Sequence, residues 1–126
     1  MKYLGIDYGK KKVGVAISEG VVAAPYGVIQ SSGLLDALQK VRQIISREEI
    51  ELVVVGLAES GESRSMAEKF VGELKKDVAV EIVEETLSSK LADERMRMFG
   101  VKKGERAEND AMAAAIILDD YLETHA

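Results

Sequence analysis

The amino-acid sequence predicts an α/β domain built on a mixed five-stranded sheet. Three observations support this: β-type alternation over the first 30 residues, two later apolar runs that each follow a helical pattern, and a helical pattern towards the C-terminus. Strands separated by helices pair in parallel through right-handed crossovers, whereas strands joined by short turns pair antiparallel. We therefore expect a three-stranded antiparallel meander plus two parallel strands, flanked by helices.

The first 30 residues are expected to form the meander. A strand over Lys2–Tyr8 leads into a turn at residues 8–11, and a second strand over Lys12–Ser18 alternates between larger apolar and small residues. A third short strand is expected at Tyr26–Gln30. Pro25, the only proline, is expected at its entry, where a missing N–H does little harm.

The middle of the chain alternates helical and strand patterns. Ser31 or Ser32 can cap a first helix, and the apolar run Glu51–Leu57 predicts a strand buried on both faces. Ser63 can cap a second helix, which leads to a strand over Val78–Glu84. The residues expected on the core side of these two helices are Leu34, Leu38, Val41 and Ile45, then Met66, Phe70 and Leu74.

The last part of the chain is expected to hold two helices separated by a polar loop. The first helix covers roughly residues Ser88–Met98, the loop covers Phe99–Asn109, and the last helix begins near Asp110. The residues expected to face inward from the last helix are Ala111, Ala114, Ala115, Leu118 and Leu122. Because the sequence shows no linker or repeat, residues 1–126 are expected to form one domain.

Composition narrows the possible chemistry. The chain has no cysteine, and its one histidine is His125, so thiolate metal sites and Ser-His-Asp catalysis are excluded or nearly so. No stretch approaches the roughly 20 apolar residues of a membrane span, and the N-terminus lacks the apolar segment of a signal peptide. We therefore expect a cytoplasmic protein with no membrane partner.

Asp7 is the most informative acidic residue. It interrupts an apolar strand at its C-terminal end, where alternation places it on one face with Tyr3 and Gly5. In a hairpin, Gly14 and Ala16 would lie near that face and leave space above Asp7. A carboxylate in a central strand is costly to desolvate unless it is paired or metal-bound. The alternative is that Asp7 only starts the following turn, as aspartate often does.

Further acidic residues lie where two other elements begin or end. Glu84 and Glu85 close the last predicted strand with side chains on opposite faces, so at most one of them should join Asp7. Asp110 opens the last predicted helix, where the helix dipole favours a carboxylate. The alternative is that Glu84 and Glu85 are solvated strand-end residues and that Asp110 serves the helix alone.

Carboxylates gathered at one site predict a bound divalent cation. Without a cation they would repel one another and raise the pKa of one of them. Hard oxygen ligands suit Mg²⁺ or Mn²⁺, and bound Mg²⁺ keeps coordinated water molecules that can take part in the reaction. Two such ions about 4 Å apart could activate a water molecule and stabilise the leaving oxygen of a phosphodiester. This chemistry needs neither histidine nor cysteine.

Two basic clusters flank the candidate acids and could hold the phosphates of a nucleic acid. Their members are Lys10, Lys11 and Lys12 after Asp7, and Lys102, Lys103 and Arg106 before Asp110. The alternative is that both clusters are only solvated surface. The net charge of −5 also weighs against nucleic-acid binding, although local charge matters more than the sum.

Five segments, in order along nearly the whole chain, resemble the YqgF/RuvX family. They are GIDYGKKKVGVAIS (Gly5–Ser18), the Ala24-Pro25 step, VVVGLAESG (Val53–Gly61), EETLSSKLA (Glu84–Ala92) and the Asn109–Ala114 segment. The resemblance implies an RNase H-like fold related to the RuvC resolvases. It also implies a metal-dependent nuclease with Asp7, Glu85 and Asp110 as catalytic and metal-binding acids. Members are described as processing the 5′ end of pre-16S ribosomal RNA, and some as resolving Holliday junctions.

The sequence departs from the family pattern at several positions. Lys12 replaces an arginine, Ala58 a proline, Glu84 an aspartate, and Ser88 and Ser89 a pair of threonines. Thr86 replaces an arginine and so removes a five-donor group able to grip phosphate. That change affects the expected positioning of substrate more than metal binding. The literal Asp93-Glu94-Arg95 falls too late to align with the family motif.

Three functional hypotheses remain open at this point. The first is a nuclease acting on RNA or on a four-way DNA junction, the latter favouring a twofold-symmetric dimer over a monomer. The second is a nucleotide-binding lobe like those of actin and sugar kinases, which also begin with a strand, an aspartate and a glycine-rich hairpin. The third is a nucleic-acid-binding module without activity. Metal binding separates the first hypothesis from the third, and ATP binding would identify the second.

Overall fold

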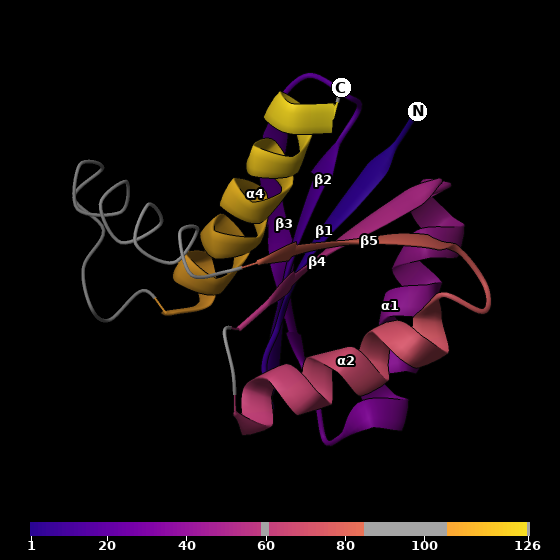
Figure 1. Ribbon diagram of the computed structural model, residues 1–126, viewed down its shortest axis with the longest axis vertical. Coiled ribbons are helices and arrows are strands. Elements are labelled where there is room, and N and C mark those ends of the chain that lie inside the picture. The colour runs from indigo at the N-terminus through magenta and orange to yellow at the C-terminus, as the bar shows by residue number, and fades with distance from the viewer. Residues whose placement is uncertain (59–60, 85–105, 126) are drawn as a thin grey trace.

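The computed structural model describes residues 1–58, 61–84 and 106–125 of the chain (Figure 1). The strands are β1 (Tyr3–Tyr8), β2 (Lys12–Ser18), β3 (Ala23–Gln30), β4 (Leu52–Leu57) and β5 (Ala79–Glu84). The helices are α1 (Leu34–Glu48), α2 (Glu62–Leu74) and α4 (Arg106–His125). The helix expected over Ser88–Met98 lies outside the described residues.

The five strands form one mixed sheet in the order β3-β2-β1-β4-β5. β1 pairs antiparallel with β2, and β2 pairs antiparallel with β3, which gives the meander. β4 pairs in parallel with both β1 and β5, because α1 and α2 carry the chain back across the sheet before each of these strands. The predicted fold class and topology are confirmed.

The helices cover both faces of the sheet (Figure 1). α1 and α2 pack on one face over a large core in which Leu38, Val41, Phe70 and Leu74 are buried, as predicted. Among the described residues, α4 is the only helix on the other face. Ile116 and Ile117 are buried there, and so are all five of its residues that were expected to face inward. Those five are Ala111, Ala114, Ala115, Leu118 and Leu122. The sheet is therefore the middle layer of three.

Small residues on the sheet let α4 lie very close to β1 and β2. A methyl group at Gly5 would come within 2.8 Å of both the Ala114 carbonyl oxygen and the Leu118 Cβ. Ala16, on the neighbouring strand, is fully buried in the same cluster. The side chains that fill the α4 side come mainly from the helix, because the strands beneath it supply little volume.

Two helix starts differ from the prediction, since glycines rather than serines occupy the N-cap positions. α1 has Gly33 at this position and α2 has Gly61, neither with a side-chain cap. The Ser31 hydroxyl is bonded to Gly33 instead, and Ser63 lies inside α2. Gly61 has a φ of 90°, which glycine adopts without a steric penalty, so backbone conformation sets that helix start.

Two element boundaries also differ. α4 begins at Arg106 rather than near Asp110, because Arg106–Asn109 contains no helix breaker. The third strand begins at Ala23, so Pro25 lies inside it instead of at its entry. β3 is an edge strand, where proline is tolerated.

Candidate functional site

Asp7 lies at the C-terminal end of β1, on the face of the sheet that α4 covers. Its neighbours across the sheet are both glycines: Gly14 on antiparallel β2 and Gly56 on parallel β4. The predicted small residue beside Asp7 is therefore confirmed on the β2 side, and β4 supplies a second one. The side chain of Asp7 is half-buried in this setting. The position combines limited access to water with a glycine on each flanking strand.

The backbone of Asp110 packs on Gly14, which is the β2 neighbour of Asp7. The backbone of Asp110 lies so close to Gly14 that a methyl group there would overlap the Asp110 carbonyl group. Because Gly14 is the β2 partner of Asp7, the two aspartates lie at the same end of the sheet and on the same face. Asp110 is half-buried and is the fifth residue of α4, so it is in the second turn and not at the helix start.

Glu84 lies on the opposite face of the sheet from Asp7, so the Glu84 carboxylate does not join Asp7 at the candidate site. Arg64 of α2 donates to both Glu84 carboxylate oxygens, from Nη1 at 2.7 Å and from Nη2 at 3.2 Å. Hydrogen bonding to this guanidinium holds the pKa of Glu84 below its ordinary value. Val83, one residue earlier, packs against the α4 cluster, as strand alternation requires.

The basic residues near Asp7 separate into two groups. Lys10 and Lys11 are exposed in the turn between β1 and β2, and Lys10 Nζ lies 3.5 Å from Glu62 Oε1. Lys12 begins β2, is half-buried, and pairs with Gln30 on β3. The structure thus brings the first basic cluster to the same end of β1 as Asp7.

The remaining predicted site residues are placed less fully. Glu85, Lys102 and Lys103 lie outside the described residues. Arg106 begins α4, although its side chain is outside them as well. The described part of the site therefore consists of Asp7, Asp110 and the first basic cluster.

The donor set suits a hard divalent cation. Asp7 and Asp110 bring two carboxylates to one end of the sheet, and carboxylate oxygen is the ligand type that Mg²⁺ and Mn²⁺ prefer. Among the described residues, no group of three or more His, Cys, Asp or Glu side chains is placed to hold a metal ion. Two candidate ligands, Asp7 and Asp110, are thus in place in the part of the chain that the structure describes.

Sequence reasoning missed two residues that the fold brings towards this end of the molecule. Arg64 also donates to the Ala58 carbonyl oxygen at 2.9 Å, so it ties the residue after β4 to the end of β5. Glu62 of α2 pairs with Lys10 from 52 residues away. Neither residue belongs to a recognisable sequence motif, because the residues that each one contacts become its neighbours only through the order of the strands in the sheet.

Comparison with known families identifies the family of this chain. The model of the family described as "RuvX: Holliday junction resolvase" matches residues 1–124. The chain belongs to the RuvX family. Members from Chlorobaculum tepidum and Bacteroides fragilis are 35% and 34% identical to it, and each alignment covers 98% of this chain and at least 94% of the relative. Both are named "Putative pre-16S rRNA nuclease".

Solved structures agree with the RNase H-like fold predicted for this RuvX member. RuvC of T. thermophilus in complex with a Holliday junction superposes with a TM-score of 0.64 at 19% identity, covering 99% of this chain and 96% of RuvC. The fowlpox virus Holliday junction resolvase also gives 0.64, at 12% identity over the full length of both chains. In the described part of the RuvX chain, no helix is both long and apolar enough to cross a membrane.

Proposed function

We propose that this chain is a divalent-metal-dependent nuclease that hydrolyses RNA phosphodiester bonds in maturation of the 5′ end of pre-16S ribosomal RNA. The observation that carries the proposal is the meeting of Asp7 and Asp110 at Gly14. Membership of the RuvX family and the names of the C. tepidum and B. fragilis relatives support the substrate. Family membership also favours a nuclease over a nucleotide-binding lobe of the actin kind.

The proposed metal ligands are Asp7, Asp110 and Glu85, with Mg²⁺ or Mn²⁺ as the cation. Support for Glu85 comes from β5, in which Val83 packs towards α4 whereas Glu84 is held by Arg64 on the other face. Continued alternation would give the next α4-facing position to residue 85. A bound divalent cation lowers the pKa of water and stabilises the charge that develops on phosphate oxygens.

Asp7 and Asp110 contribute chemistry of their own in this proposal. Their carboxylates fix the cation at the end of β1, on a sheet whose backbone is braced by pairing on both sides. Limited exposure of both side chains reduces competition from bulk water. The proposed substrate-binding residues are Lys10, Lys11, Lys12, Lys102, Lys103 and Arg106, which would neutralise backbone phosphates.

The test uses labelled pre-16S ribosomal RNA, a single-stranded RNA and a four-way DNA junction, each with Mg²⁺, Mn²⁺ or EDTA. Asp7→Asn should reduce metal-dependent cleavage by at least 100-fold, because it removes a ligand charge at nearly constant shape. Asp119→Asn is the matched control: it removes the same charge from α4, about 13 Å along the helix from Asp110. Cleavage that survives Asp7→Asn unchanged would contradict the proposal.

Holliday junction resolution is the second candidate function. The description of the family and the likeness to RuvC favour it. Faster cleavage of the four-way junction than of either RNA would select it, and light scattering would then be expected to show a homodimer instead of a monomer. Metal-independent binding with no cleavage of any substrate would instead indicate a nucleic-acid-binding module without activity.

A further inference from the structure

A hollow of about 570 Å³ lies beside the candidate site, on the side of the sheet where α1 begins. The β1–β2 turn, the end of β3 and the first turns of α1 form its walls. The side chains that define its charge are Lys10, Lys11, Lys40 and Asp36. The first two belong to the basic cluster already described, whereas no motif in the sequence indicated Lys40.

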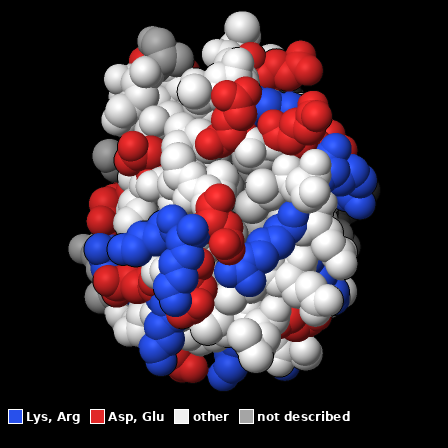
Figure 2. Space-filling model, turned by 90° about the vertical axis from the view of Figure 1, so that its right-hand side faces the viewer, with Lys and Arg blue, Asp and Glu red and all other residues white. Residues whose placement is uncertain are grey.

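The hollow is positively charged in a chain that is negative as a whole. Figure 2 shows the side of the molecule where α1 lies, with Lys and Arg side chains interleaved with Asp and Glu side chains in its lower half. The lining of the hollow holds three lysines and one aspartate, and Glu62 pairs with Lys10 at 3.5 Å, so the local excess is one positive charge, against a net charge of −5 for the chain. The local field therefore attracts anions, as a nucleic-acid-binding surface requires.

Existing contacts fix Lys40 at the wall of the hollow. Its Nζ donates to the Gln30 carbonyl oxygen at 2.7 Å and lies 3.1 Å from Asp36 Oδ2. Asp36 in turn accepts from the Ser32 backbone N–H at 3.0 Å, so its carboxylate is already occupied at the start of α1. The ammonium group of Lys40 is thus held in place by two acceptors, and its side chain is still 43% exposed.

The serines of the hollow are already bonded within the fold, so the lysines would bind the ligand. The Ser31 hydroxyl donates to the Gly33 carbonyl oxygen at 2.9 Å, and Ser32 is bonded to Asp36. Lys11 is exposed at the opposite wall. Phosphate oxygens suit such a site, since lysine binds phosphate as a point charge with three hydrogen-bond donors.

The position of the hollow ties it to the substrate strand. Lys10 and Lys11 follow Asp7 by three and four residues, so they lie at most about 14 Å away along the chain. Successive nucleotides in a strand advance by roughly 3.4 Å. A strand cut at Asp7 would therefore reach the hollow within about four nucleotides of the cleaved bond.

We propose that the hollow between Lys11 and Lys40 binds backbone phosphates of the substrate strand within about four nucleotides of the bond that is cut. This inference rests on the proposed nuclease function and adds to it the path of the strand. The strand leaves Asp7 across the β1–β2 turn and passes towards the start of α1. Lys40 acts there in binding and register, and it takes no part in the chemical step.

The test measures binding separately from cleavage. Fluorescence anisotropy with a labelled 12-nucleotide RNA in EDTA reports affinity for the wild type and for Lys11→Gln, Lys40→Gln and the double variant. Each substitution should weaken binding about fivefold near 0.1 M salt and lower the salt slope by about 0.7. Lys40→Arg, which keeps the charge, should bind within about twofold of the wild type.

Lys76→Gln is the matched control. Lys76 also pairs with a nearby carboxylate, Glu73 at 3.2 Å, but it follows the C-terminal end of α2, away from the hollow. This variant changes the net charge by the same amount as each single lysine substitution in the hollow. Unchanged RNA affinity in Lys76→Gln would therefore show that the position of the lost charge weakens binding, and not the loss of charge by itself. Thermal melts should place all variants within about 3 °C of the wild type, because these ion pairs are exposed.

Two results would overturn the inference. The first is a double variant that binds RNA as tightly as Lys76→Gln. The second is inorganic phosphate shifting the NMR signals of Lys11 and Lys40 while RNA affinity stays insensitive to both substitutions, which would mark a site for the free anion. A wild type that binds through these lysines but cuts nothing would overturn the proposed nuclease activity and leave the hollow as a strand-binding site.

Discussion

At the scale of single residues, Gly14 is the position on which the candidate site depends most directly. Its missing side chain is the space that the Asp110 backbone occupies, and its strand partner is Asp7. Gly14→Ala should therefore push the start of α4 away from the sheet, weaken Mg²⁺ binding and cost about 1–3 kcal/mol of unfolding free energy through overpacking. Urea unfolding and calorimetric Mg²⁺ titration measure the two effects.

Gly27→Ala is the control for that experiment. Gly27 lies in β3 of the same sheet, and a methyl group there would have no heavy atom within 4 Å. The substitution should leave Mg²⁺ binding intact and change stability by less than about 1 kcal/mol. Equal losses in the two variants would show that alanine in these strands is harmful by itself, and that the approach of Asp110 is not the cause.

Much of the residue-level prediction could be made from alternation alone. Period two placed Asp7 beside a small residue of the neighbouring strand, and this result follows from strand geometry. The predicted serine N-caps were wrong, because a sequence pattern does not show which other group a serine hydroxyl will bond. Ser31 had a nearer partner in Gly33, and Gly61 began α2 through its backbone conformation.

At the scale of elements, the end of β5 is held by Arg64. Its guanidinium joins α2 to Glu84 and to the carbonyl after β4, so three elements meet at one side chain. The pKa of Glu84 is lowered by this contact, so the contact stabilises the fold above the ordinary glutamate pKa of about 4.3. That stabilisation is lost as the pH falls through the lowered, folded-state value.

Glu84→Gln should therefore destabilise the protein more at pH 7 than at pH 3. Urea unfolding of wild type and variant at the two pH values gives the comparison. Glu62→Gln is the control, because the ion pair of Glu62 with Lys10 is longer, at 3.5 Å, and both side chains are at least 70% exposed. A Glu84→Gln penalty that grows on acidification would contradict the assigned direction of the pKa shift.

Element order was predictable, whereas two element boundaries were not. Hydrophobic period and turn residues gave five strands in the right sequence, even though the edge strands β3 and β5 contain no fully buried residue. The start of α4 was placed four residues late, since the polar Arg106–Asn109 segment matches both a loop and an exposed first turn. The Arg64 contacts were beyond pattern reasoning, because they depend on which strands become neighbours.

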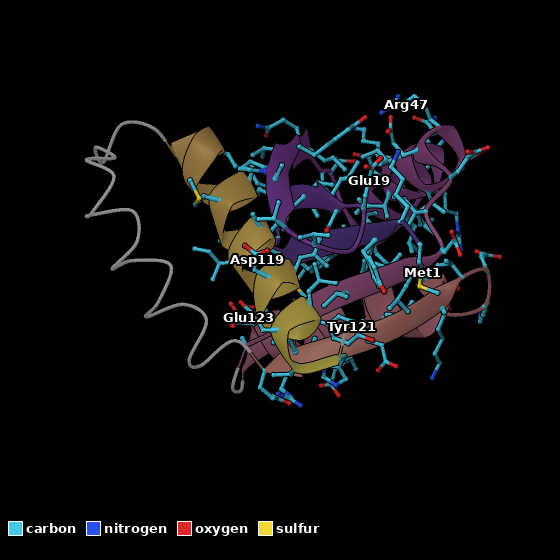
Figure 3. The ribbon with its side chains drawn as sticks, turned by 90° about the horizontal axis from the view of Figure 1, so that it is seen from above. Met1, Glu19, Arg47, Asp119, Tyr121 and Glu123 are labelled. Atoms are coloured by element: carbon cyan, nitrogen blue, oxygen red, sulfur yellow. The ribbon has the colours of Figure 1, made fainter. Side chains whose placement is uncertain are left out.

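At the scale of the whole molecule, the two layers over the sheet are unequal. Within residues 1–58, 61–84 and 106–125, the core cluster on the α1 and α2 side has 17 buried members, whereas the cluster on the α4 side has seven. Seen from above, α4 crosses its face of the sheet without a helical neighbour among the described residues (Figure 3). In the described part of the chain, the layer that carries Asp110 therefore has the smaller buried cluster of the two.

This asymmetry predicts different outcomes for two matched core truncations. Leu118→Ala, on α4, and Leu38→Ala, on α1, each empty a buried position and should cost about 2–5 kcal/mol. Leu118→Ala should expose α4 amides to hydrogen exchange before the rest of the chain and abolish cleavage. Leu38→Ala should lower protection throughout the sheet. Identical exchange patterns in the two variants would mean that the layers open as one unit.

The arrangement at the outer edge of β3 has a consequence for how the protein behaves in a crowded cell. Asp119 of α4 accepts the Ala23 backbone N–H at 2.7 Å, and two residues later Pro25 offers no N–H at all. A free strand edge is a template on which another chain can add and begin to aggregate. Neither Ala23 nor Pro25 can donate a backbone N–H to an added strand, so the start of β3 does not offer a template for such pairing. The helix that brings Asp110 to the site therefore also protects the molecule from self-association.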